Sequence, residues 1–218
     1  IELIQNSIYI VSAFLFTLGI KKLSSPATAR QGNLISSIGM LIAVIVTVIQ
    51  CDILGLKTVL IGLVLGTLIG IAAARLIAMT AMPEMVALLN GFGGASSLLL
   101  AWGAFVAEPA IGLISAITIA ISLFIGSITF SGSLIAYGKL AEILPGRPLV
   151  IPGQLLINLA LLGGIVYSGF LFALDPISAQ TPFYIFIGLS LALGIFAVSS
   201  IGGGDMPVVI ALLNSYSG

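Results

Sequence analysis

The residues that could do chemistry in this sequence are few, and most of them are uncharged. The chain of 218 residues has no histidine, one cysteine (Cys51), seven acidic side chains and seven basic ones. Without histidine, no side chain titrates near neutral pH unless its pKa is shifted. A single cysteine excludes a disulfide within the chain. The sequence also has no Walker lysine and no G-x-G-x-x-G following a strand, so we expect neither a nucleotide nor a metal to bind to this chain alone.

Two asparagines occupy equivalent places in an internal repeat. Residues 82–94 match residues 206–218 at seven of thirteen positions, with Asn90 aligned to Asn214. Each asparagine follows a proline by seven residues, which is about 10 Å along a helix. An unpaired amide costs several kcal/mol in an apolar environment, so each needs hydrogen-bond partners. Interhelical packing is the simpler interpretation, but two asparagines at equivalent depths on related helices favour a shared polar pathway.

A run of small and hydroxylated residues at 126–138 adds further polar groups. Ser127 and Ser131 are separated by four residues, as are Thr129 and Ser133, so each pair shares one face of a helix. Small residues in membrane helices usually permit close packing, and their hydroxyls often bond the carbonyl four residues back. Packing is therefore the simpler role for any one of them.

Polar residues near helix starts have structural interpretations. Gln154 and Asn158 form another pair separated by four residues, and we expect a structural role for both. Asp205 follows three glycines and precedes the second copy of the repeat. Its carboxylate is expected to cap the free amides of that helix and to favour the positive end of the helix dipole. The same carboxylate would compete with a phosphate, which argues against an anion site there.

The elements that must position these residues are membrane-spanning helices. The sequence is 60% hydrophobic and 6% charged, with a mean hydropathy of +1.31. A soluble domain carries roughly 25% charged residues, whereas a membrane-crossing helix needs about 20 apolar ones. We predict an all-α polytopic transmembrane bundle with eight visible spans, the last cut off before it can cross and a ninth beyond it. The predicted spans are 3–20, 33–50, 56–75, 82–107, 110–138, 152–172, 181–199 and 206–218.

The charges predict how these spans are oriented. With these boundaries, six of the seven basic residues fall on one side, and only Lys57 falls on the other. This bias predicts that the basic side is cytoplasmic, with the N-terminus outside. All charges fit into loops or helix ends, which leaves no carboxylate or base at the membrane centre. Proton movement through such a domain would need neutral polar groups, water or a residue of a partner.

Several stretches together resemble a known family. They are the Arg-Gln-Gly-Asn ending at Asn33, Met82-Pro-Glu with Ala-Leu-Leu-Asn, Thr129-Phe-Ser-Gly-Ser with Tyr-Gly-Lys-Leu, and Gly203-Gly-Asp-Met-Pro-Val-Val with Leu-Asn-Ser-Tyr-Ser-Gly. Over almost the whole chain the sequence resembles the beta subunit of proton-translocating NAD(P) transhydrogenase. The resemblance implies an enzyme that couples proton entry to hydride transfer from NADH to NADP+. Residues 1–218 would be its proton-translocating membrane domain.

The resemblance also implies the surroundings of this domain. Nine spans would be followed by a cytoplasmic NADP(H)-binding domain. The alpha subunit would supply the NAD(H) domain and further membrane helices, and the assembly would be a dimer in the bacterial cytoplasmic (inner) membrane. No cofactor would bind to this chain itself. Separately, the balance of seven basic and seven acidic residues argues against nucleic-acid binding.

Four site residues follow from the resemblance. The family's proton-route asparagine matches Asn214, its cytoplasmic-end aspartate matches Asp205, and its fifth-span serine matches Ser133. Asn90 stands where many members have the histidine assigned to proton transfer. An asparagine cannot take up a proton at useful pH. Our hypothesis is that a histidine on an alpha-subunit helix facing Asn90 replaces it.

Three other classes of function are alternatives to this interpretation. A secondary transporter for a small solute would place a central site between repeats, with broken helices and paired polar groups at the midplane. The sequence shows these features only weakly. A membrane anchor would not need aligned asparagines, and a cation channel would need a ring of acidic residues that the sequence lacks.

Overall fold

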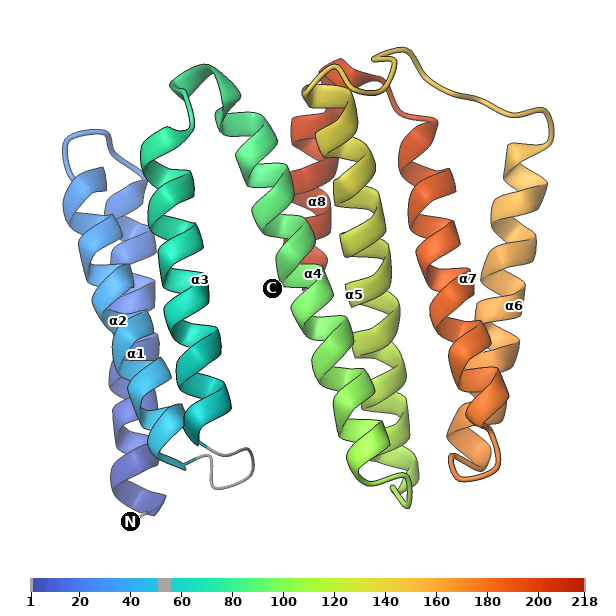
Figure 1. Ribbon diagram of the computed structural model, residues 1–218, viewed down its shortest axis with the longest axis horizontal. Coiled ribbons are helices and arrows are strands. Elements are labelled where there is room, and N and C mark those ends of the chain that lie inside the picture. Colours follow the sequence, from blue (N-terminus) through green and yellow to red (C-terminus); the bar gives the residue numbers. More distant parts are fainter. Residues whose placement is uncertain (1, 51–55, 218) are drawn as a thin grey trace. The chain divides into compact units, whose positions relative to one another are not determined.

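The computed structural model describes residues 2–50 and 56–217 (Figure 1). Cys51 and Asp52 therefore lie outside the described residues, as does Gly218. Every regular element within the described ranges is helical: α1 (Glu2–Leu23), α2 (Ala29–Gln50), α3 (Leu56–Leu76), α4 (Met82–Ala107), α5 (Leu113–Leu140), α6 (Gln154–Leu174), α7 (Gln180–Ser199) and α8 (Met206–Ser217), with 3-10 turns η1 (Met79–Ala81) and η2 (Gly203–Asp205).

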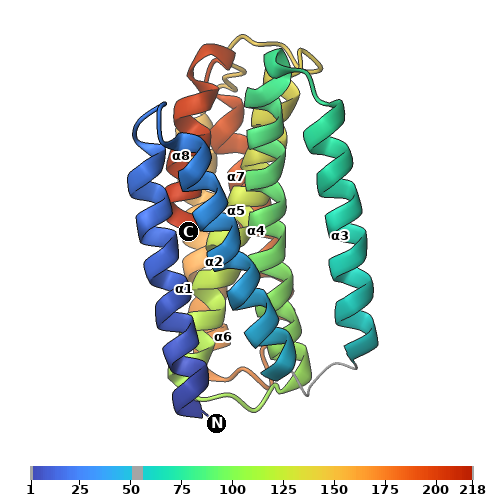
Figure 2. The same ribbon diagram turned by 90° about the vertical axis from the view of Figure 1, so that its left-hand side faces the viewer.

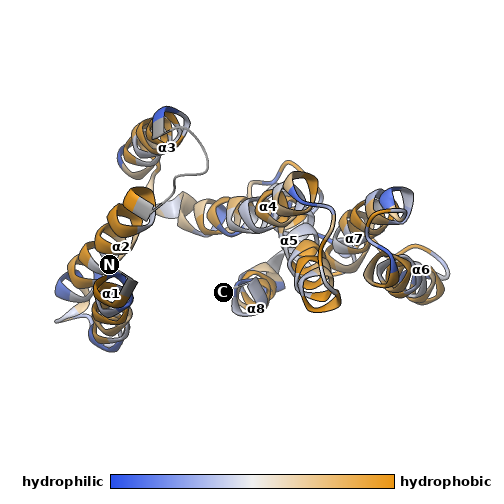
Figure 3. Ribbon diagram, turned by 90° about the horizontal axis from the view of Figure 1, so that it is seen from below, coloured by the Kyte–Doolittle hydropathy of each residue, from blue (hydrophilic) through white to orange (hydrophobic). Residues whose placement is uncertain are grey.

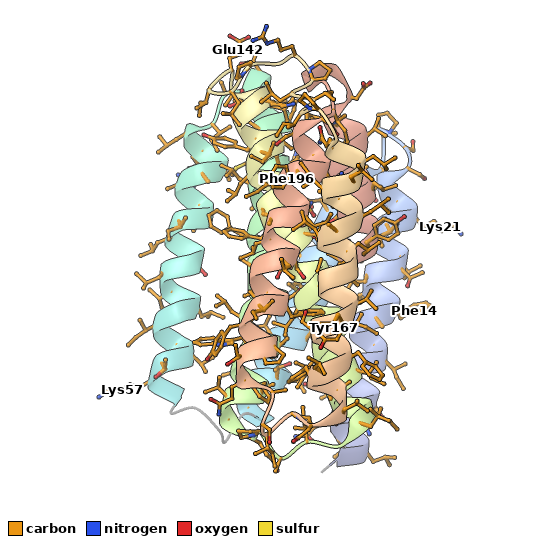
Figure 4. All side chains as sticks on the ribbon, turned by 90° about the vertical axis from the view of Figure 1, so that its right-hand side faces the viewer. Phe14, Lys21, Lys57, Glu142, Tyr167 and Phe196 are labelled. Atoms are coloured by element: carbon orange, nitrogen blue, oxygen red, sulfur yellow. The ribbon has the colours of Figure 1, made fainter. Side chains whose placement is uncertain are left out.

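The predicted helical bundle is confirmed in its class and in most of its boundaries. Seven helices, α1 to α7, are long and apolar enough to cross a membrane in the described part of the chain. The helix α2 begins at Ala29, four residues earlier than predicted, and α5 runs for 28 residues. The helix α8 has only 12 residues, so the eighth and ninth spans stay predictions. Charged residues mark the helix ends, as Lys57 does at the start of α3 (Figure 4).

The first compact unit holds α1, α2 and α3 and ends at Leu76. The helices α1 and α2 pack as a hairpin (Figure 2). The two helices approach each other closely at glycines. A Cβ on Gly19 or Gly32 would lie 2.9 Å or less from backbone atoms of the other helix, so a larger residue would not fit there. The Ser12 hydroxyl donates to the Gly39 carbonyl across this contact. Lys21, near the end of α1, lies close to the turn that joins the two helices.

The second compact unit runs from Ile77 to the end of the chain and contains α4 to α8. Within it, α5 contacts α4, α6, α7 and α8 and so forms the centre of the unit (Figure 3). Its helices alternate in direction from α4 to α7, so α4, α6 and α8 begin at the end where α5 and α7 finish (Figure 1). Outward faces are apolar, as on α6, where Tyr167 and its neighbours are exposed (Figure 4).

Two clusters of buried side chains hold the second unit together. One lies toward the end where α4 and α6 finish and is built around Phe105, Phe172 and Phe183, whose ring centroids are 4.4 to 5.1 Å apart. Such aromatic contacts join α4, α6 and α7. The other cluster lies toward the opposite end and joins α4, α5, α7 and α8 through six residues: Ala87, Ala136, Val198, Met206, Ile210 and Leu213. This second cluster supports the helices that carry the repeated asparagines.

Candidate functional site

The internal repeat of the sequence is also a repeat of backbone structure. Each copy has an extended residue, then a 3-10 turn, then an α-helix: Ala78 (φ −68°, ψ 150°) before η1 and Gly202 (φ −71°, ψ 152°) before η2. The first helical residues, Met82 and Met206, also have matching dihedral angles. A proline follows each of them, where the missing N–H has no intrahelical partner to lose. The structural repeat thus starts four residues before the sequence repeat, since 78–81 and 202–205 have the same backbone shape but share no residue.

The two repeated helices, α4 and α8, lie side by side and line a half-open cavity. Its volume is about 790 Å³, and its walls come from equivalent faces of the two helices. Four pairs of lining residues are related by the repeat: Pro83 with Pro207, Val86 with Ile210, Asn90 with Asn214, and Gly93 with Ser217. The predicted pairing of Asn90 and Asn214 around one polar space therefore has a geometric counterpart. The remaining walls are mainly apolar, which leaves the amides as its most polar side-chain groups.

Asn90 is fixed by a hydrogen bond to the central helix. Its Nδ2 donates to Ser133 Oγ over 2.9 Å, and the two residues are 8% and 0% exposed. The amide oxygen of Asn90 keeps its acceptor capacity. Two residues that the resemblance placed in one pathway, Asn90 and Ser133, are thus brought together.

This contact depends on a close crossing of α4 and α5 at glycine. A Cβ on Gly94 would lie 2.7 Å from the Phe130 nitrogen and 2.8 Å from the Gly126 oxygen. A Cβ on Gly126 would likewise lie 2.7 Å from the Gly94 oxygen. Only glycine permits helix backbones to approach so closely, as small residues do in membrane helix pairs. The crossing lies one turn beyond Asn90, which therefore meets α5 at short range.

Asn214 lies on the opposite wall of the cavity in a different environment. It is exposed, and its side chain makes no hydrogen bond with any other residue that the structure describes. Its backbone carbonyl accepts a hydrogen bond of 3.3 Å from the Ser217 hydroxyl. Both ends of the Asn214 amide are therefore available to water or to a partner group at the cavity.

Asp205 lies at the end of η2, exposed and directly before α8. Its backbone N–H donates to the Gly202 carbonyl over 3.1 Å. Across the described ranges its carboxylate makes no hydrogen bond, so the capping bond expected from the sequence is not formed there. The carboxylate still lies beside the first turn of α8, where the positive end of the helix dipole favours a negative charge. Asp205 directly precedes α8 and Asn214 lies about two and a half turns further along, so the structure does not bring them together.

The other polar residues of α5 and α6 mainly hold helices together. Ser131 Oγ donates to the Ser127 carbonyl over 2.9 Å and faces Gly194 of α7, as the packing interpretation predicted. Gln154 Nε2 donates to the Phe196 carbonyl over 2.6 Å, and its Oε1 accepts from the Ile151 N–H. These bonds fix the start of α6 against α7 and confirm a structural role for Gln154. Asn158 Oδ1 is buried without a partner within the described residues.

Sequence reasoning missed one polar residue of this region. Lys139 lies in the last turn of α5, among the charges at helix ends as the sequence predicts, but the structure buries it to 3% exposure. Its Nζ donates to the carbonyls of Ser199 and Ile201, each over 2.6 Å. The spacing Tyr-Gly-Lys-Leu at the end of an apolar helix does not distinguish a buried lysine from an exposed one. Only the fold of the next loop over the helix end reveals its burial.

Taken together, these features define the class of the protein as a multi-pass helical membrane protein with a mainly apolar pocket, lined by two asparagines, between two repeated helices. The chain belongs to the NAD(P) transhydrogenase beta subunit family, whose model matches residues 5–218. It is similar to the NAD(P) transhydrogenase subunit beta of Rhodospirillum rubrum, with 36% identity over 96% of this chain and 47% of the relative. The protein of the same description from strain ATCC 11170 gives the same values. The chain therefore spans about half the length of these relatives.

Proposed function

We propose that this chain is the proton-conducting membrane domain of a proton-translocating NAD(P) transhydrogenase. The complete enzyme would couple proton movement across the membrane to hydride transfer from NADH to NADP+. The observation that carries this proposal is the cavity between α4 and α8, with an asparagine of each repeat copy in its wall. Membership of the beta subunit family supports the assignment of the reaction.

In this proposal the polar residues conduct protons by ordering water. An amide cannot take up a proton at useful pH, but it donates and accepts hydrogen bonds at once. With Nδ2 bound to Ser133, Asn90 offers its Oδ1 to water, while Asn214 offers both a donor and an acceptor. Such groups hold a chain of waters at low cost, because bridging waters replace direct hydrogen bonds with little loss. Asn90, Ser133 and Asn214 then line the route.

The group that takes up the proton would come from a partner. The alpha subunit would contribute membrane helices and the NAD(H) domain, and a histidine on one of these helices would face Asn90. This hypothesis fails if the alpha-subunit sequence has no intramembrane histidine. The intact domain would have nine spans with the N-terminus outside, and the enzyme would be a dimer in the bacterial cytoplasmic membrane.

Coupling requires a segment of the protein with two conformations. Both the bound nucleotide and the occupancy of the proton route must shift the equilibrium between these conformations. We assign that segment to the α7–α8 junction and the start of α8. Asp205, exposed at this junction, would respond to the NADP(H)-binding domain expected downstream of the chain. The hydride chemistry belongs to NAD(H) and NADP(H) in the soluble domains. This chain would supply the gated proton route and would connect it to the NADP(H)-binding domain through the α7–α8 junction.

The test compares Asn214→Leu with the wild-type enzyme. Proton movement into vesicles is followed while the assembled enzyme oxidises NADPH with an NAD+ analogue as hydride acceptor. We expect loss of proton movement and of coupled turnover, with hydride exchange between the isolated soluble domains retained. Asn158→Leu on α6 is the matched control, because it removes an asparagine that does not line the cavity. Proton movement that survives in Asn214→Leu would show that Asn214 does not line the route, which would then run through other residues or another subunit.

A further inference from the structure

The buried Lys139 side chain links the end of α5 to other segments of the chain and is not part of the proton route proposed above. The ammonium group has three N–H donors, and three backbone carbonyls surround it. Those of Ser199 and Ile201 are each 2.6 Å away, and that of Arg147 is 3.5 Å away. All three acceptors are therefore main-chain groups from segments that follow α5 in the sequence. Hydrogen bonds from a charged donor are about twice as strong as neutral ones.

These three carbonyls come from the segments that meet at the start of α8. Ser199 is the last residue of α7, and Ile201 lies in the linker before η2. A lysine at the end of α7 is favoured there because the unpaired carbonyls and the helix dipole make that end negative. Lys139 therefore caps α7 from outside that helix while also holding the linker to α8.

The loop that follows α5 closes over the same place. The Gly203 N–H donates to the Gly146 carbonyl over 2.7 Å, and the Leu149 N–H donates to the Ser199 carbonyl over 3.0 Å. Glu142 takes a left-handed conformation (φ 56°), which turns the chain back towards these groups. The loop thus binds the end of α7 and the start of η2 through its own main chain. The segment before α8 is therefore held by the main-chain bond from Gly203 to the loop and by the bond from Lys139 to the Ile201 carbonyl.

We propose that Lys139 is a positioning residue: its ammonium group fixes the α7–α8 junction and so sets the direction in which α8 presents Asn214 to the cavity. The consequence for proton movement rests on the proposed function, whereas the consequence for the junction does not. The start of α4 provides an internal comparison, because η1 has the same backbone shape without a lysine bound to its linker in the described part of the chain.

The experiment measures backbone amide exchange in the assembled enzyme for Lys139→Met, Lys139→Arg and Arg147→Gln. Methionine keeps the length of the side chain but removes the charge and all donors. Arginine keeps a charged donor. Arg147→Gln removes an exposed charge of the same loop and leaves its carbonyl in place. Exchange is followed by mass spectrometry in peptides covering 199–206 and, as the internal control, 77–84. Protons moved per hydride transferred are measured on the same preparations.

We expect Lys139→Met to raise exchange in 199–206 by about tenfold or more, the size expected for loss of a charge-assisted hydrogen bond. Exchange in 77–84 should not change. The number of protons moved per hydride should fall in the same variant. Lys139→Arg should restore much of both properties, and Arg147→Gln should behave as wild type. If Lys139→Met does not accumulate in the membrane, Lys139→Gln, which removes the charge and keeps an amide donor, provides the same comparison.

Three results would overturn the inference. One is unchanged exchange in 199–206 when the lysine is replaced. Another is raised exchange with full coupling, which would make the lysine a purely structural residue. The third is an arginine variant that behaves as the methionine variant does. If instead no variant, wild type included, moves protons, the proposed function fails, while the exchange measurement still decides whether Lys139 holds the junction.

Discussion

The starts of α4 and α8 are two copies of one backbone element, and different contacts hold each copy in place. Both begin with an extended residue, a 3-10 turn and a Met-Pro pair, and both carry an asparagine eight residues after the methionine. The helix α4 is fixed along its length by the glycine crossing with α5, and Asn90 is buried and bonded. The helix α8 is fixed at its start by the junction around Lys139, and Asn214 is exposed at the cavity.

This difference shows that sequence identity within a repeat does not give its copies the same role. Asn90 is part of the packing between α4 and α5 as well as part of the cavity wall. Asn214 has no such packing partner within the described ranges, so its amide is available to the cavity. We call α4 the fixed wall, because its crossing with α5 holds it along its length, whereas α8 is held at its start by the junction around Lys139 and by its buried face. The predictions below are ordered by the size of the expected effect.

The largest loss of stability is expected from Gly94→Ala, which disrupts the crossing of α4 and α5 that holds the fixed wall. The new methyl group would lie within 2.8 Å of backbone atoms of α5, so the helices must separate. Overpacking of this kind costs about 1–3 kcal/mol of stability, and it should also lengthen the Asn90–Ser133 contact. Gly103→Ala on the same helix is the matched control, because its methyl group would meet nothing within 4 Å. Thermal unfolding of the purified enzyme in detergent measures both; equal stability of the two variants would contradict the crossing.

The next largest effect on stability is expected to distinguish Asn90 from Asn214. Asn90→Leu removes a buried hydrogen bond and is expected to lower stability by about 1–2 kcal/mol. Asn214→Leu removes no hydrogen bond within the described residues, so its stability should stay within about 0.5 kcal/mol of wild type. The same unfolding measurement compares them. Equal losses of stability would mean that Asn214 has a structural partner in the assembled enzyme and that the two walls are alike.

A smaller difference is expected between two serines of α5. Ser133→Ala leaves the Nδ2 of Asn90 without its acceptor and should cost about 1 kcal/mol. Ser131→Ala removes a hydroxyl that bonds a carbonyl of its own helix, so the change should be a few tenths of a kcal/mol at most. Unfolding of the single variants, and of Ser133→Ala combined with Asn90→Leu, checks this. Additive losses in the double variant would show that the two side chains do not interact.

The smallest stability effect is expected at Asp205. Its carboxylate is exposed and interacts mainly with the dipole of α8, so Asp205→Asn should cost no more than about 0.5 kcal/mol. That loss should shrink further at high salt, since exposed charges are screened. Glu84→Gln, in the first turn of α4, is the matched variant. If Asp205 serves coupling as proposed, Asp205→Asn should lower the number of protons moved per hydride, whereas Glu84→Gln should not.

Much of the fold follows from the sequence alone. Apolar runs of about 20 residues can avoid exposing backbone polar groups to lipid only as helices. Charges, prolines and glycines then mark their ends, and seven of the predicted spans have counterparts in α1 to α7. The repeat of Met-Pro with Ala-Leu-Leu-Asn also predicted that α4 and α8 begin in the same way, which the structure shows. Asn90 and Asn214 line one pocket, and their common role in a proton route stays a prediction.

Only the tertiary structure decided which polar groups meet. In a membrane helix the faces toward lipid and toward protein are both apolar, so the sequence pattern does not reveal how each helix is rotated. The bond between Asn90 and Ser133 depends on that rotation and on the crossing at Gly94 and Gly126. The burial of Lys139 depends on a loop folding back over a helix end. Residues far apart in the sequence make these contacts, and they form only when the helices are packed.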